Sequence, residues 1–156
     1  MLLWTVFFAV VVAAVSYKCP GGKLTPQGRI NIVNQNNKLR SQLIHGKLKN
    51  KDGKYMPHGK NMLELTWNCD LEKSAQKWAN KCVFQHSPRK KGIGENIYTY
   101  WSSESVKDHK ESAGTDAGKA WWGELPKKYK NNPSNNLTAG VASQPVLHFT
   151  QVKRFF

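Results

Sequence analysis

The sequence predicts an α+β domain, with three helices and short extended segments. Apolar residues recur at helical spacing over residues 26–45, 71–82 and 117–130, since steps of three and four place side chains on one helical face. Residues 92–98 follow a glycine-punctuated turn, which favours a short strand, and residues 61–67 suit an extended piece or one helical turn. A chain of 156 residues has the size of one domain.

Residues 1–16 are expected to form a signal peptide. Leu2 to Val15 are almost continuously apolar, and Ala14-Val15-Ser16 fits the small-x-small rule for cleavage. A membrane anchor is the alternative, but the apolar run is short for a bilayer span. The mature protein is therefore expected to be secreted and extracellular, with one domain over residues 17–156.

Capping residues predict the ends of the first and third helices. Thr25 followed by Pro26 gives an N-cap and a first-turn proline, and Gly46 marks a stop. For the third helix, Asp116 is the expected N-cap and Pro126 the stop. Its inward-facing residues are expected to be Ala117, Ala120, Trp121 and Leu125.

The second helix leads into a stretch that can hold a site. Asp70 is its expected N-cap, and its apolar face comprises Leu71, Ala75, Trp78 and Cys82. A basic loop then separates His86 from Glu95, which precedes the predicted strand. A histidine and a glutamate therefore lie at the two ends of a loop beside a packed helix.

The net charge of +14 comes mainly from lysine runs. They occupy Lys47 to Lys60, Arg89 to Lys91 and Lys127 to Lys130. Outside the cell the relevant polyanions are glycosaminoglycans and anionic membrane surfaces, although such runs also serve as solvated faces. No motif of a nucleic-acid-binding protein accompanies the charge, which argues against nucleic acid as a partner.

Three cysteines, Cys19, Cys69 and Cys82, are candidates for a disulfide in an oxidising compartment. The odd number implies a free thiol, an intermolecular bridge or a missing partner. The position of Cys82 on a packed helical face also suits a buried thiol. Asn136 begins an Asn-Leu-Thr sequon in a turn-rich loop and is a predicted glycosylation site.

Several motifs together resemble one family. A-x-K-W-A-x-x-C-x-F-x-H-S, then G-E-N-I-Y, A-W-W-G-E-L and H-F-T-Q-V occur in this order from residue 75 to residue 152. They resemble the CAP superfamily of cysteine-rich secretory proteins, antigen 5 venom allergens and pathogenesis-related 1 proteins, and in particular its nematode venom-allergen-like and Ancylostoma-secreted-protein-like members. The resemblance implies a three-layer α/β/α sandwich in which the helices pack on a small antiparallel sheet, with His148 on a strand.

The resemblance also implies a site made of two histidines and two glutamates, His86, Glu95, Glu124 and His148. Two neutral imidazoles can bind zinc while carboxylates orient them or a bound water, so zinc is the implied cofactor. The spacing alone would not have indicated a site, because the histidines lie far apart and form no short ligand repeat.

The resemblance implies a secreted, non-enzymatic protein that interacts with a host protein or receptor in tissue or immunity. A sterol- or lipid-binding or glycosaminoglycan-binding module is one alternative. A weak hydrolase, metal-dependent or built on Ser87 beside His86, is another, although the chain has no G-x-S-x-G nucleophile elbow.

The match to the family pattern stops after Val152, where the chain continues with Lys-Arg-Phe-Phe. Family members continue with further strands and cysteines. We therefore expect an incomplete sheet, an unpaired edge beside the strand of His148, and a partner for the odd cysteine in the missing part.

Overall fold

The computed structural model describes residues 17–88, 91–103, 105, 109, 111–130 and 138–152. The predicted signal peptide and Asn136 lie outside these residues. The described helices are α1 (Pro26–Ile44), α2 (Cys69–Ala79), α3 (Ala113–Trp122), α4 (Glu124–Lys128), α5 (Ala139–Ala142) and α6 (Leu147–Val152). None of them is both long and apolar enough to cross a membrane.

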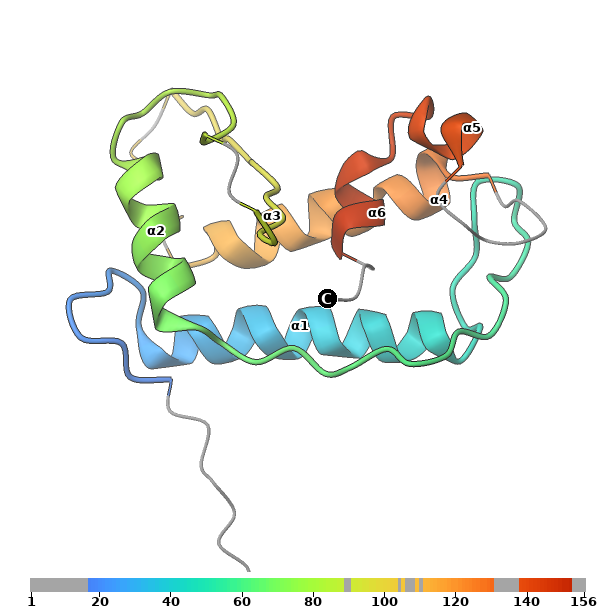
Figure 1. Ribbon diagram of the computed structural model, residues 1–156, viewed down its shortest axis with the longest axis horizontal. Coiled ribbons are helices and arrows are strands. Elements are labelled where there is room, and N and C mark those ends of the chain that lie inside the picture. Colours follow the sequence, from blue (N-terminus) through green and yellow to red (C-terminus); the bar gives the residue numbers. More distant parts are fainter. Residues whose placement is uncertain are drawn as a thin grey trace, which may run out of the picture.

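The long helix α1 forms the base of the molecule, as Figure 1 shows. Helices α3 and α4 lie above it, with α3 packed on α1, and α6 packs on both α3 and α4. Helix α2 stands near the start of α1, while the loop that follows α1 lies at the opposite end, beside α4 (Figure 1). From that loop the chain returns along α1 to reach α2.

The predicted bounds of α1 are confirmed to within one residue. The hydroxyl of Thr25 accepts a hydrogen bond of 3.0 Å from the backbone N–H of Gly28, and Pro26 opens the helix. The helix ends at Ile44, and Gly46 has a φ of +63°, a conformation that favours glycine.

Helix α2 begins two residues earlier than predicted, because Asn68 rather than Asp70 is the N-cap. The Asn68 side chain accepts from the N–H groups of Asp70 and Leu71, both at 2.9 Å. The helix stops at Ala79, so Cys82 lies beyond it, with a φ of +52° and an exposed side chain. The prediction of a buried thiol on a packed helical face was therefore wrong, and α2 has no buried residue.

The third predicted helix is divided in two at Gly123. Asp116 lies within the first turn of α3 instead of capping it, and pairs with Lys119 at 2.9 Å. Pro126 does not end the helix as predicted, because it is the third residue of α4. Proline has no backbone N–H, and in the first turn of a helix that N–H has no intrahelical partner. The break turns Trp122 and Leu125 inward and leaves Ala120 exposed and Trp121 half-buried.

The segment before α2 is held to α1 by side chains. Asn37 both donates to the carbonyl of Leu65 (2.9 Å) and accepts from its N–H (2.8 Å), as a neighbouring strand would. The only strand-type pairing among the described residues is an isolated antiparallel bridge between Lys49 and Tyr55. The three-layer sandwich with its small sheet therefore stays a prediction.

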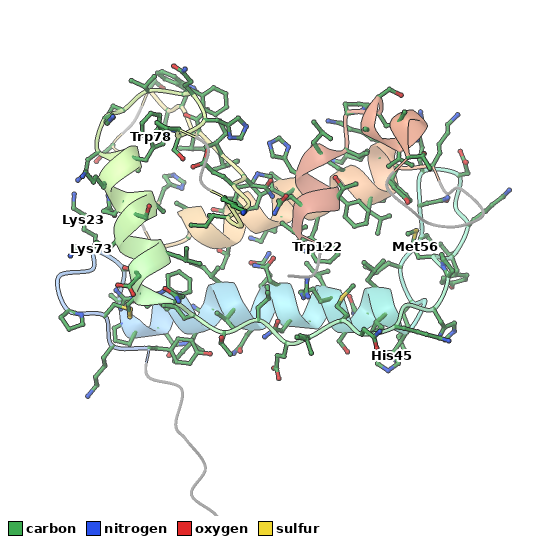
Figure 2. The ribbon with its side chains drawn as sticks, viewed as in Figure 1. Lys23, His45, Met56, Lys73, Trp78 and Trp122 are labelled. Carbon is green, nitrogen blue, oxygen red and sulfur yellow. A yellow bond between two sulfur atoms is a disulfide. The ribbon has the colours of Figure 1, made fainter. Side chains whose placement is uncertain are left out.

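The core lies where α1, α3, α4 and α6 meet. Phe149 is fully buried and packs edge-to-face on Trp122 and Tyr129, with ring centroids 5.7 and 5.3 Å apart. Trp122 also reaches α1, where its Nε1–H donates to Asn36 (Figure 2). The buried cluster comprises Leu43, Met56, Trp122, Leu125, Tyr129, Val141, Val146 and Phe149.

A disulfide joins Cys19 to Cys69, which are 50 residues apart, and Cys82 is a free thiol. Closing a loop of this length restricts the unfolded chain, and such bonds typically contribute about 2–4 kcal/mol. Cys69→Ser is therefore expected to lower the free energy of unfolding by about that amount in urea denaturation. Cys82→Ser is the matched control and should leave the midpoint unchanged. Equal midpoints for Cys69→Ser and the unmodified protein would contradict the prediction.

Candidate metal site in the cleft

His86 and Glu95 form the first half of the site, and a loop brings them together. The Nδ1 of His86 lies 2.8 Å from Oε1 of Glu95, and because a carboxylate only accepts, Nδ1 carries the hydrogen. The N–H and the hydroxyl of Ser87 also donate to Glu95. Burial would raise the pKa of Glu95, but these hydrogen bonds outweigh it and hold the pKa below its ordinary value.

His148 and Glu124 form the second half. His148 lies on helix α6, not on the predicted strand, and its Nδ1 donates to Oε1 of Glu124 at 2.9 Å. The other carboxylate oxygen of Glu124 accepts from the backbone N–H of Phe149 at 2.9 Å. The Glu124 side chain is buried while that of His148 is 39% exposed. The glutamate therefore holds the histidine ring from the interior side.

Both histidines line one cleft of about 390 Å³, together with Glu95, Asn96, Leu147, Thr150 and Gln151. Glu124 lies behind His148 and does not line this cleft. Because a glutamate holds each Nδ1–H, the Nε2 of each neutral ring keeps the lone pair that can bind a metal. The arrangement is that of two carboxylate–histidine pairs that share a cavity.

Several further residues position the two pairs. The side chain of Asn96 donates to the carbonyl of His148 at 3.1 Å and so ties the loop to α6. The Trp121 ring lies nearly parallel to that of His148, with centroids 6.3 Å apart. Gly94 lies against the side-chain amide of Gln151, which an added Cβ would displace. The quoted motifs contain these residues, but nothing in the sequence assigned them a role.

The structure brings the four predicted residues together in two pairs. Each predicted histidine meets a predicted glutamate, across 9 residues for His86 and Glu95 and across 24 for His148 and Glu124. Among the described residues, no group of three or more histidine, cysteine, aspartate or glutamate side chains is arranged to enclose a metal ion. A metal in this cleft would therefore have protein ligands on part of its coordination sphere only.

Comparison with known proteins places these motifs in a family. The model of the CAP, cysteine-rich secretory protein family matches residues 33–153. Ancylostoma secreted protein of Ancylostoma caninum is 33% identical over 147 residues, which span 90% of this chain and 34% of that protein. Salivary antigen-5 of Triatoma infestans is 30% identical over 168 residues, spanning 94% of this chain and 66% of that protein. The chain belongs to the CAP family.

Two solved structures share the fold. BmVAL-1 has a TM-score of 0.85 and 69% identity, covering 87% of this chain and 67% of that one. A structure of NaASP2 with Zn2+ has a TM-score of 0.76 and 34% identity, covering 86% of this chain and 70% of that one. The chain spans about a third of the length of the first curated relatives that it matches. These relatives are named as secreted proteins and allergens and not as enzymes.

Proposed function

We propose that this chain is a secreted, extracellular CAP protein that binds a divalent metal, preferably zinc, between His86 and His148, and acts by interaction with other molecules. The observation that carries the proposal is the pairing of both Nδ1 atoms with glutamates inside one cleft. Such pairing fixes the tautomer and the ring orientation and raises the basicity of the opposite nitrogen. Imidazole nitrogen is a preferred zinc ligand.

The donor set of the cleft suits zinc in an open site. Two imidazoles from His86 and His148 would supply the protein ligands, and Glu95 lies close enough to His86 to orient it or a bound water. The remaining positions would fall to water or to a group from a partner. That NaASP2, a structural relative, has a structure with Zn2+ supports the choice of metal.

An interaction role in host tissue or immunity accords with the names of the relatives, which include a secreted protein and a salivary antigen. The Cys19–Cys69 disulfide suits an extracellular location. The sterol or lipid alternative draws support from exposed apolar side chains such as Phe84 and Trp101, but neither of these lines the cleft of the two histidines. The serine-hydrolase alternative is weaker, because the hydroxyl of Ser87 donates to Glu95.

Zinc titration by calorimetry tests the proposal. The wild-type protein is expected to bind one Zn²⁺, and His148→Gln to abolish the binding heat, since a direct ligand is lost. Glu124→Gln is expected to weaken binding by about tenfold to a hundredfold, as loss of a residue that orients a ligand does. His45→Gln is the matched control, because His45 is exposed and bonds its own helix at Ser41.

Thermal melts accompany each titration, because Glu124 also accepts from Phe149 and its loss can lower stability. A variant counts only if it is folded at the titration temperature. Equal zinc affinity for the wild type, His148→Gln and His45→Gln would remove the cleft as the metal site.

A further inference from the structure

A rigid hairpin displays lysines at the end of the molecule opposite α2. Residues 49–55 turn back on themselves, with the Asn50 N–H bonded to the carbonyl of Lys54 at 2.8 Å. The Asn50 side chain is buried and accepts from the N–H groups of Asp52 and Lys54, both at 3.0 Å. Gly53 completes the turn with a φ of +72°. The lysines of this hairpin therefore project from a fixed backbone.

The same hairpin is joined to the residue that follows α4, Tyr129, which lies 78 residues after Lys51 in the chain. The N–H of Lys51 donates to the carbonyl of Tyr129 at 3.0 Å, and Tyr129 is fully buried. This contact places the hairpin beside the run of lysines that ends α4, as Figure 1 shows for the two segments. We call the combined set the lysine cluster: Lys49, Lys51, Lys54, Lys127, Lys128 and Lys130.

Few acidic groups offset this charge. Asp52 is the one acid between residues 47 and 60, and Glu124 is the one acid between residues 124 and 137. Glu124 is buried and accepts from His148, with the Lys128 ammonium 4.0 Å away. All six lysines of the cluster are exposed. The cluster is thus a concentrated positive surface and not a network of ion pairs.

We propose that the lysine cluster binds a linear sulfated polysaccharide of the extracellular matrix. Two separate segments supply the charges to one surface, which lets successive sulfates of one chain meet several ammonium groups. The lysines lie on a backbone that the Asn50 turn and the Lys51–Tyr129 contact already hold in place, so binding costs little ordering of the protein.

A polysaccharide suits this surface better than a membrane. Anionic lipids give their negative potential mainly to the cytoplasmic leaflet, whereas the proposed location is extracellular. Stable attachment to a bilayer also requires apolar groups beside the charge. The hairpin exposes one large apolar side chain, Tyr55, and the Lys49 ammonium lies over its ring, 4.8 Å from the ring centroid. The exposed apolar side chains of Leu71, Val83 and Phe84 belong to α2 and the loop after it, at the other end of the molecule from the hairpin (Figure 1).

Binding of a size-defined heparin oligosaccharide tests the proposal, in 0.15 M salt with EDTA to remove any metal. The test variant carries Lys51→Gln, Lys54→Gln and Lys130→Gln. These substitutions remove three ammonium groups and leave the backbone hydrogen bonds of the hairpin in place. We expect its Kd to rise about tenfold or more, and the affinity of the wild type to fall steeply with added salt. The matched control carries Lys38→Gln, Lys73→Gln and Lys77→Gln, removes the same charge from α1 and α2, and is expected to change the Kd less than about twofold. Figure 2 places Lys73 far from Met56, which follows the hairpin.

Three results would overturn the proposal. They are no binding of heparin by the wild type, an equal loss in both triple variants, and cluster-dependent binding to phosphatidylserine vesicles without binding to heparin. Because EDTA is present, the outcome does not depend on zinc, and His148→Gln is expected to bind heparin as the wild type does. Failure here would therefore leave the metal proposal intact, and failure of zinc binding would leave this one intact.

Discussion

Glu72→Gln is expected to lower the free energy of unfolding by about 3–5 kcal/mol, because it leaves the buried charge of Arg29 uncompensated. The Arg29 guanidinium donates twice to the Glu72 carboxylate, both at 2.7 Å, and the two side chains are only 2% and 7% exposed. The Trp67 indole donates to the same carboxylate at 2.8 Å. Arg29 also bonds the carbonyl of Tyr17, so this pair joins the N-terminal segment, α1 and α2. Urea denaturation measures the loss.

Glu64→Gln is the control for this variant, since Glu64 is exposed, and its effect should stay within about 0.5 kcal/mol. The decrease of the free energy of unfolding at acid pH gives a second readout. The Arg29 hydrogen bonds lower the pKa of Glu72 against the opposing effect of burial. A lowered folded-state pKa stabilises the protein above the unfolded-state pKa, and this contribution is lost as the pH falls through the folded-state value. Glu72→Gln should remove that part of the acid dependence. Similar unfolding midpoints for Glu72→Gln and Glu64→Gln would contradict the assignment.

Phe149→Ala is expected to lower the free energy of unfolding by about 3–5 kcal/mol, the usual range for truncation of a fully buried aromatic residue. Phe149 is 0% exposed and lies between the rings of Trp122 and Tyr129, so truncation opens a cavity where α3, α4 and α6 meet. The adjacent Phe149 N–H bonds Glu124, and the loss of packing should also loosen the His148–Glu124 pair. Thermal melts followed by near-ultraviolet circular dichroism measure the change.

Leu147→Ala is the control on the same helix, because the Leu147 side chain is 58% exposed, and we expect a change within about 0.5 kcal/mol. Equal decreases in melting temperature for Phe149→Ala and Leu147→Ala would contradict the placement of Phe149 in the core.

The local features of the fold could be predicted from sequence where one residue determines them. Thr25, Pro26 and Gly46 gave α1 correctly because a cap and a left-handed glycine act through nearby backbone. The same reasoning placed the N-cap of α2 at Asp70, whereas the structure has it at Asn68. Both residue types can accept from a helix N-terminus, so the residue type alone does not fix the position of the cap.

The environment of His148 could not be predicted in this way. Residues 147–152 are too few for periodicity to separate a strand from a helix, and what turns them into α6 is the burial of Phe149 against α3 and α4. The four site residues were identified through the family motifs. Their pairing, His86 with Glu95 and His148 with Glu124, depends on tertiary contacts that residue spacing does not encode.

The most direct test of the zinc proposal is the anomalous difference map of crystals grown with Zn²⁺ and measured on both sides of the zinc absorption edge. We predict a peak in the cleft about 2.0–2.1 Å from the Nε2 atoms of both His86 and His148, with each Nδ1 still bonded to its glutamate. The absence of a peak between these two nitrogens in crystals that hold zinc elsewhere, for example on an exposed histidine such as His45, would contradict the account.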